Sequence, residues 1–482
     1  MSVSRSVRPG DRVIHRVRGE GLVLGLSPGA KAKVRLDGDP GLPWTLSLGE
    51  LKLIEPPPAP KPEALKPAKK QPTGPSLTAW AWKEVPTVES AANSLDRAEL
   101  RQTIEAMRLG VVPAEYARDY TVGREEALQD VEDLLEVKGG LRVLWGDYGA
   151  GKTHMLDLAE RVALERGYLT SRVVLDPHEV PPSHPRRLYS ALVERLRYPD
   201  DQGHGLEPLL HRLADSKEHR SHLGHNFSRF LSPFLHAEQH GDAELSEWMR
   251  DYVDGCNMDS AWGNSRLMRS GWVGPRVLTM SDYRTYGRMY MHLLGTIAAW
   301  AEDAGYKGLF LLFDEVEFVD SLTPVQQGFA MEVLKHYAAV TLPKEELRFD
   351  PDGLYKGGHK VHQDLRLFFR SDQPLTVMFG LTPLPDIKES FDSILEPDLH
   401  DVQLPPLTEE DMGALADAVL RIYMRAYPDS SWTMEDLQKV QEGVEGAAAD
   451  FGHSPRVLVR SIVGQLDALR WQARGWSPPT GF

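Results

Sequence analysis

The segment GDYGAGKT at residues 146–153 constrains the fold of this chain more than any other feature of the sequence. An apolar run at 141–145 precedes the segment, and an amphipathic helical pattern begins near Lys152. Its glycines permit a backbone whose N–H groups converge on phosphate oxygens, and the N-terminus of the following helix adds a favourable dipole. The segment therefore predicts a phosphate-binding loop (P-loop) between a buried strand and a helix.

The P-loop pattern assigns a role to each of its polar residues. We expect Lys152 to reach the β- and γ-phosphates of ATP and the Thr153 hydroxyl to bind Mg²⁺. The residues predicted to contact the nucleotide in this loop are Gly146, Gly149, Ala150, Gly151, Lys152, Thr153 and His154.

A second segment, KGLFLLFDEVEFVD at 307–320, carries an apolar strand that ends in adjacent acids. At the carboxyl end of a strand next to the P-loop strand, Asp314 would hold Mg²⁺ through water and Glu315 would orient the attacking water as general base. The alternative is an acidic strand-to-helix turn in which Glu315 caps the helix. The P-loop upstream favours the catalytic interpretation.

The remaining pattern predicts an α/β fold with flanking modules. From about residue 95, strand-like runs alternate with long helical stretches, which indicates a parallel sheet wrapped by helices. Residues 1–55 instead alternate short apolar runs with turn signals, including DGDPG, and predict a small β-barrel. The predicted domains are the barrel (1–55), a Pro/Lys-rich linker (56–77), a P-loop core (78–405) with a helical insertion at about 200–285, and a helical or winged-helix-like lid (406–482).

Bulk composition limits the location and the partners. The net charge of −15 opposes nonspecific coating of nucleic acid, so any DNA contact must be local. The N-terminus lacks an apolar leader pattern, no apolar run is long enough to span a membrane, and we expect a cytoplasmic protein. The single cysteine, Cys256, excludes an internal disulfide, and we expect it to be a buried apolar residue.

Several segments resemble known ATPase families. In PLTVMFGLTPLPD, Thr382 follows a strand where AAA+ proteins place a polar sensor of the γ-phosphate, although it could equally be a turn residue. DFGHSPRVLVRSIV resembles the sensor of the lid in origin-recognition-type ATPases; Arg456, or less well Arg460, would supply charge to the phosphates, or would be a surface arginine. DYTVGREEALQ resembles the segment that precedes the P-loop in origin-recognition-type and STAND ATPases, which implies that Val122 and Gly123 pack beside adenine and that Arg124 orders the turn.

Taken together, TVGREEAL, GDYGAGKTHML, VVLDPHEVPP, FLLFDEVE, FGLTPLPD and LPPLTEEDMGALADAVL resemble the BREX-system ATP-binding family. The resemblance implies an AAA+-like or STAND-like P-loop NTPase that works in antiphage defence, beside DNA or a DNA-processing partner such as a helicase or nuclease. It also implies a possible homo-oligomer, but ESFDSILEPDLHDVQLPPL lacks the arginine finger that many relatives carry there. Arg366 or Arg370 could replace it. The N-terminal GDRVIHRVRGEGLV resembles the SH3-like modules of CarD-type regulators and UvrD-type helicases, which implies a protein partner for the barrel.

Two weaker signals remain open. The histidines of KEHRSHLGHNF could bind zinc, or could lie on a solvated helix: His219, His222 and His225. The basic loop RFDPDGLYKGGHKVHQDLRLFFR could touch single-stranded nucleic acid, or could be an ordinary surface loop.

The sequence thus indicates an ATPase that powers or regulates a DNA-associated complex. Its two rivals are a nucleotide-gated switch with slow turnover and a transcription-linked adaptor recruited through the barrel.

Overall fold

The structure of the 482-residue chain is a computed structural model. It describes residues 12–15, 19–27, 31–36, 44–47, 51–53, 80–88, 94–111, 116–201, 203–215, 231–356, 365–367, 372–396, 398–451 and 454–475. The chain divides into two compact units, Met1–Gln71 and Pro72–Phe482.

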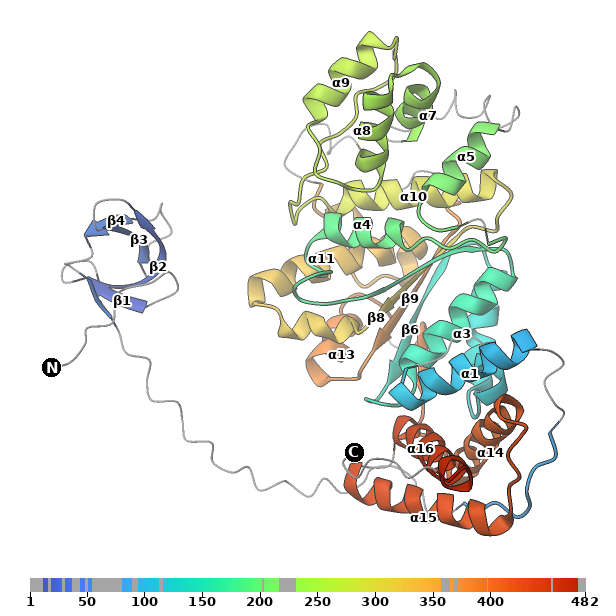
Figure 1. The fold of residues 1–482 in the computed structure, drawn as a ribbon. Helices are drawn as coiled ribbons and strands as arrows, with labels where there is room; N and C mark the ends of the chain where they lie inside the picture. The colour runs from blue at the N-terminus through green and yellow to red at the C-terminus, as the bar shows by residue number, and fades with distance from the viewer. Residues whose placement is uncertain are drawn as a thin grey trace. The chain divides into compact units, whose positions relative to one another are not determined.

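The first unit is a five-stranded antiparallel sheet (Figure 1). Its strands pair in the order β4-β3-β2-β1-β5, and β2 carries a bulge where it pairs with β3. Their bounds are Arg12–His15 (β1), Gly19–Ser27 (β2), Lys31–Leu36 (β3), Trp44–Ser47 (β4) and Leu51–Leu53 (β5). These strands coincide with the predicted runs. The likeness to SH3 modules stays a prediction, and the DGDPG turn and the linker at 56–77 lie outside the described residues.

The second unit is built on a five-stranded parallel sheet in the order β10-β6-β9-β8-β7. Its strands are Gly140–Gly146 (β6), Leu169–Val174 (β7), Leu309–Asp314 (β8), Leu375–Leu381 (β9) and Asp401–Leu404 (β10). The α/β P-loop fold predicted from the sequence is confirmed. One detail was wrong: β8, which ends in Asp314, is not the neighbour of the P-loop strand β6, because β9 lies between them. Chain order does not reveal such crossovers.

Each central strand is buried on both faces, so its residues alternate between two hydrophobic cores. Leu309, Leu311 and Phe313 of β8 join the larger core, whereas Phe310 and Leu312 join the smaller one on the opposite face. Parallel strands covered on both sides show this near-continuous apolar pattern. The sequence LFLLFD therefore follows from the position of β8 inside the sheet.

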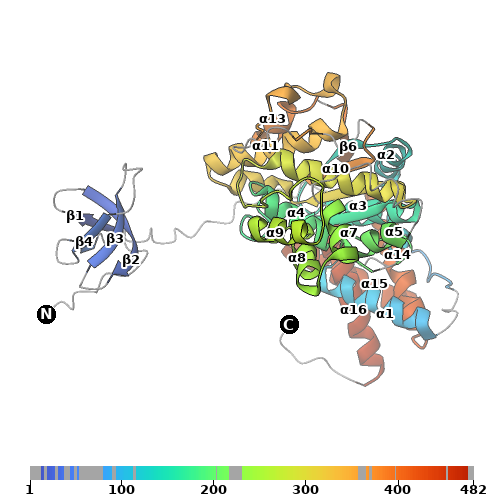
Figure 2. The ribbon, with the colours of Figure 1, turned by 90° about the horizontal axis from the view of Figure 1, so that it is seen from above.

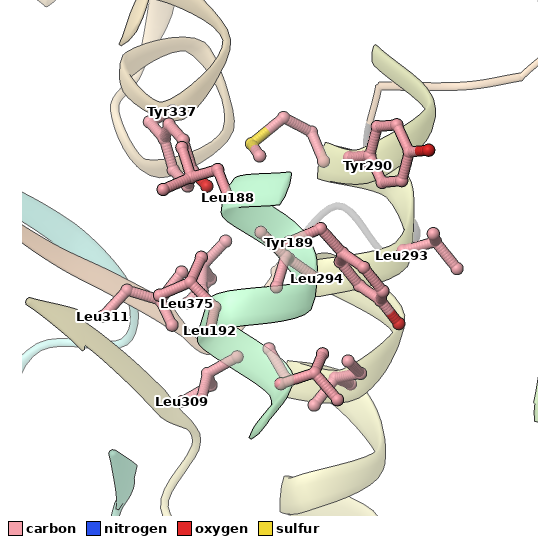
Figure 3. Packing of buried hydrophobic residues seen from close by; sticks show 14 of the residues in the cluster. Leu188, Tyr189, Leu192, Tyr290, Leu293, Leu294, Leu309, Leu311, Tyr337 and Leu375 are labelled. Carbon is pink, nitrogen blue, oxygen red and sulfur yellow. The ribbon is translucent and has the colours of Figure 1, made fainter. Parts of the chain in front are cut away.

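Helices cover the two faces unequally (Figures 1 and 2). The smaller core is covered by Glu125–Glu136 (α2) and Lys152–Glu165 (α3). The larger core is covered by Pro185–Glu194 (α4), Gly287–Asp303 (α10) and Pro324–Thr341 (α11). In Figure 3, α4 lies between α10 and the strands, with Leu188, Leu192 and Tyr189 pointing into the packed interior. This packing buries the face of the sheet that carries Leu309, Leu311 and Leu375.

Between α4 and α10 the chain forms further helices, at the opposite end of the unit from α14–α16 (Figure 1). They span Glu207–Asp215 (α5), Leu231–His240 (α7), Ala243–Val253 (α8) and Ser260–Arg269 (α9). Cys256 was expected to be buried, and that expectation was wrong: the side chain is exposed. It lies in the turn after α8, where its N–H donates to the carbonyl of Asp251, so its position is set by the turn and not by core packing.

A separate helical core joins the two ends of this unit. It contains Trp80 and the helices Ser94–Leu109 (α1), Glu409–Ala426 (α14), Met434–Phe451 (α15) and Pro455–Ala473 (α16). The residues before the P-loop therefore pack with the C-terminal helices, which the predicted boundary at 405 did not anticipate. We call this group the helical cluster.

Short elements complete the second unit. They are the 3₁₀ helices Ala117–Tyr120 (η2), Val316–Ser321 (η3), Lys344–Glu346 (η4) and Pro351–Gly353 (η5), and the helix Pro385–Asp392 (α13). None of the described helices combines the length and the apolarity that crossing a membrane requires.

Candidate active site

The loop after β6 has the backbone of an anion-binding nest. Gly149 and Gly151 have φ angles of +83° and +99°, in the left-handed region that favours glycine. Gly151 is the N-cap of α3, so the first N–H groups of the helix point toward the loop. Tyr148, at the outer side of the loop, is 84% exposed. The segment thus provides convergent N–H donors at a helix N-terminus, as predicted for phosphate binding.

Lys152 is held inside the loop by polar groups from two strands. Its side chain is 7% exposed, and its Nζ donates to the carbonyl of Gly146 at 3.0 Å and to Oγ1 of Thr382 at 2.8 Å. Thr382 follows β9, the strand beside β6. The ammonium group is therefore positioned between the P-loop and the end of β9.

Two acids at the end of β8 face the same region. Asp314 is 1% exposed; burial raises the pKa of its carboxyl group, while a hydrogen bond with the Thr153 side chain lowers that pKa. Glu315 has a φ of +58°, which a residue other than glycine seldom adopts. Burial raises the pKa of Glu315, and the carboxylates of Glu317 and Asp314 raise it further.

The oxygens of Thr153 and Asp314 fit a magnesium site. Mg²⁺ prefers hard oxygen ligands and is commonly held by one or two protein groups together with water and substrate phosphates. The hydroxyl comes from the first turn of α3 and the carboxylate from the end of β8, and the two are close enough for a hydrogen bond. The described residues contain no cluster of three or more ligands that would bind a metal alone.

Glu317 is a site residue that the sequence reasoning did not assign. Its carboxylate accepts a hydrogen bond from the Thr382 hydroxyl and lies 3.8 Å from Nζ of Lys152. A signal was present in the sequence, because Glu317, the third acid of the segment DEVE, falls in the turn that follows the strand.

A cavity of about 200 Å³ lies against the P-loop. Its polar end is formed by residues 148–154 and Glu315. Its apolar end is lined by side chains of α1, α14 and α16 together with two connecting segments: Met107, Tyr120, Val122, Leu407, Leu415 and Val459. The cavity is therefore shared between the parallel sheet and the helical cluster.

Arg124 ties the segments around the cavity together. The side chain is 6% exposed and donates to the carbonyls of Gly123 (3.0 Å), Pro405 (2.8 Å) and Ala150 (2.8 Å). Burial lowers the pKa of the Arg124 guanidinium. Arg124 thus orders the turn before α2, as expected, and also fixes a P-loop carbonyl.

His154 connects the P-loop helix to the segment before α2. The Thr121 hydroxyl donates to the Ala117 carbonyl at 2.6 Å and lies 2.7 Å from Nε2 of His154. Because the hydroxyl has one proton, it accepts from Nε2–H. Burial and the nearby charge of Arg124 lower the pKa of His154 to about 4, so the ring is neutral at pH 7.

The structure places the predicted site residues in two groups. Those that line the cavity are Val122, Gly149, Ala150, Gly151, Lys152, Thr153, His154, Glu315 and Arg456. Those that lie behind the lining are Gly123, Gly146, Asp314 and Thr382. Gly123 packs against Asp411: a Cβ there would come within 2.7 Å of that carboxyl group.

The two candidate sensor arginines differ in position. Arg456 lies in the first turn of α16 and lines the cavity, whereas Arg460, about one turn further along, does not; both side chains lie against Gly110. Arg366 is exposed away from the cavity lining. Arg370, the three histidines and part of the basic loop, residues 357–364 and 368–370, lie outside the described residues.

One known protein family matches part of the chain. The family described as "BREX system ATP-binding protein BrxC/D" matches residues 95–247. The expected resemblance is confirmed over this stretch. It includes the P-loop and the segment before α2. No curated protein matches the chain.

Among solved structures, the chain is similar to the Walker-type ATPase PABY2304 of Pyrococcus abyssi, with 12% identity and a TM-score of 0.30 over 74% of this chain and 77% of that chain. It is also similar to a chain of Drosophila ORC bound to DNA, with 12% identity and a TM-score of 0.26 over 82% of this chain and 73% of that chain.

Proposed function

We propose that this protein binds ATP with Mg²⁺ and hydrolyses ATP to ADP and phosphate. The observation that carries the proposal is the convergence of two strand ends on one cavity. The P-loop after β6 supplies N–H donors and Lys152, and the end of β8 supplies Asp314 and Glu315. A nest, a lysine and a pair of acids are the parts that phosphoryl transfer from a nucleotide requires.

Each residue of the polar end would bind the triphosphate, hold Mg²⁺ or activate the water that attacks the terminal phosphate. Amides of residues 149–153 and the ammonium of Lys152 would bind the phosphates, and Thr153 and Asp314 would hold Mg²⁺. When bound, Mg²⁺ neutralises charge on the phosphates. Glu315 would accept the proton of the attacking water, Thr382 would contact the terminal phosphate, and Arg456 would supply positive charge near the phosphates.

The apolar end fits a nucleobase. Val122 lines it beside Tyr120 and Met107, and we propose that adenine packs there, with Gly123 next to it in the chain. Burial of the flat base against apolar side chains stabilises binding without requiring a charged partner.

We propose further that the ATP cycle moves or assembles the partners of a DNA-associated complex of the antiphage-defence kind. The resemblance over residues 95–247 supports this role. The partners would be DNA or a DNA-processing protein such as a helicase or nuclease. Because the net charge is −15, we expect DNA to contact a limited surface.

The test is ATP turnover by the full chain with and without single- and double-stranded DNA. We expect DNA to stimulate turnover, and both Lys152→Ala and Glu315→Gln to abolish the stimulated rate. ATP binding with negligible turnover in every condition would contradict the proposal that ATP hydrolysis moves or assembles the partners of the complex.

That outcome would favour the second candidate, a nucleotide-gated switch with slow turnover. One observation supports it: the P-loop touches the start of α16, since a Cβ on Gly149 would lie 3.3 Å from the Cβ of Ser454. Nucleotide in the cavity would therefore contact both the sheet and the helical cluster, and could set the position of the cluster. Oligomers that form only with ATP would identify the switch. The protein partner of the barrel, the adaptor role and homo-oligomer formation stay predictions.

A further inference from the structure

Glu317 brings a third carboxylate to a site that has one lysine. It lies in η3, the 3₁₀ helix directly after β8, whose tight turn returns the side chain toward the P-loop. The side chain is only 12% exposed. Asp314, Glu315 and Glu317 thus face the ammonium of Lys152 within four consecutive positions.

The hydrogen bonds around Thr382 have a defined direction. An ammonium group has donors only, so the Thr382 hydroxyl accepts from Lys152 at 2.8 Å. Its single proton therefore goes to Oε1 of Glu317, which accepts it. Oε1 also lies 3.8 Å from Nζ of Lys152. The Glu317 carboxyl group also faces the carboxyl group of Glu315, and this proximity raises the pKa of Glu315.

The consequence concerns the two groups that the proposed function directs toward the terminal phosphate. In this arrangement the Thr382 hydroxyl cannot donate to a phosphate oxygen, because its proton is used by Glu317. Lys152 donates one hydrogen bond to the Thr382 hydroxyl and one to the carbonyl of Gly146. An anionic phosphate oxygen would compete with an anionic carboxylate for the same donors.

We propose that Glu317 is a positioning residue that competes with the γ-phosphate of ATP for Lys152 and Thr382. It holds both groups in place while no terminal phosphate is present and regains them after the phosphate leaves. Glu317 therefore lowers the affinity for ATP more than the affinity for ADP. This inference rests on the proposed function, because it assumes that ATP occupies the cavity.

The test compares Glu317→Gln with the unchanged chain, using a non-hydrolysable ATP analogue and ADP, each with Mg²⁺, in equilibrium binding. We expect the Kd of the ATP analogue to fall about tenfold and the Kd of ADP to change less than about threefold, because the neutral amide is a weaker acceptor than the carboxylate and leaves Thr382 and Lys152 free to donate to the γ-phosphate. Glu389→Gln is the matched control: it removes one exposed charge on α13, which packs beside η3, and should leave both Kd values unchanged.

A second pair of variants tests the route through Thr382. Thr382→Val removes the hydroxyl that links Lys152 to Glu317, so adding Glu317→Gln to Thr382→Val should lower the Kd of the ATP analogue by less than about threefold. An equal gain in both backgrounds would show that the charge acts without Thr382, and would overturn the proposed positioning.

The outcomes separate this inference from the proposed function. One contrary result is that Glu317→Gln weakens the binding of the ATP analogue and of ADP equally; another is that it leaves the Kd of the analogue unchanged while Lys152→Ala abolishes binding. Either result would show that Glu317 does not compete with the γ-phosphate, and the proposal that the cavity binds ATP would stand. If the unchanged chain does not bind the ATP analogue, the proposed function fails and this inference fails with it.

Discussion

The two ends of the cavity are built in different ways. The polar end comes mainly from one continuous stretch, residues 148–154, with Glu315 added from the end of β8. The apolar end draws Met107, Val122, Leu407, Leu415 and Val459 from segments spread over most of the second unit. A short motif can specify the first because its geometry is local. The second exists only when the helical cluster has packed against the sheet.

This difference predicts which substitutions affect only the reaction or nucleotide binding and which also affect the packing of the helical cluster. Changes at the polar end should remove a defined catalytic or binding step and leave folding intact. Changes at the apolar end should affect both nucleotide affinity and the stability of the helical cluster.

The largest effect is expected for Glu315→Gln at the polar end. The amide cannot accept a proton from water, so kcat should fall about hundred- to thousandfold. ATP affinity should change less than about threefold, since the substitution keeps the shape of the side chain. Steady-state turnover and equilibrium binding measure the two quantities. A loss of binding as large as the loss of turnover would mean that Glu315 holds the site together.

The next largest effect is expected for Leu415→Ala at the apolar end, and it is an effect on nucleotide affinity. Losing contact with the base should raise the Kd of ATP about tenfold. Tripolyphosphate, which has no base, should bind as before when measured by displacement. The free energy of unfolding should fall by about 2 to 5 kcal/mol, because Leu415 is also part of the helical core.

Leu420→Ala is the matched control for that prediction. Leu420 is buried in the same helix, α14, but does not line the cavity. Stability should fall by a similar amount while the Kd of ATP stays the same. Equal losses of ATP affinity in both variants would remove the distinction between the two ends.

The smallest effect is expected for Arg456→Ala, at the border between the helical cluster and the polar end. The side chain is exposed, so screening by solvent and salt limits its contribution, and the Kd of ATP should rise about threefold at low salt. The effect should disappear at high salt. Arg474→Ala, at the other end of α16, should change nothing. A larger, salt-independent loss would place Arg456 in direct contact with the phosphates.

The sequence predicted the local parts of this structure well. The strands β6, β8 and β9 and the start of α3 follow from buried apolar runs and from the glycine loop, which act over a few residues. The five strands of the first unit follow from alternation and turn signals.

The parts that depend on tertiary packing were not predicted. The insertion of β9 between β6 and β8 is a matter of strand order, which leaves no mark on either segment. Trp80 and α1 pack with α14 and α16 although they precede the P-loop in the chain. The sequence pattern of Trp80 and α1 does not indicate which helices they contact. Glu317 was passed over because its role depends on Thr382, which follows a different strand.

The most direct test of the account is equilibrium binding of ATP with Mg²⁺ to the full chain and to Lys152→Ala. We expect saturable binding at one site per chain, weakened at least about hundredfold by the substitution, because the lysine is the one group of the P-loop that brings a full positive charge to the phosphates. Equal affinity in the two proteins, or no binding in either, would contradict the assignment of this cavity as a nucleotide site.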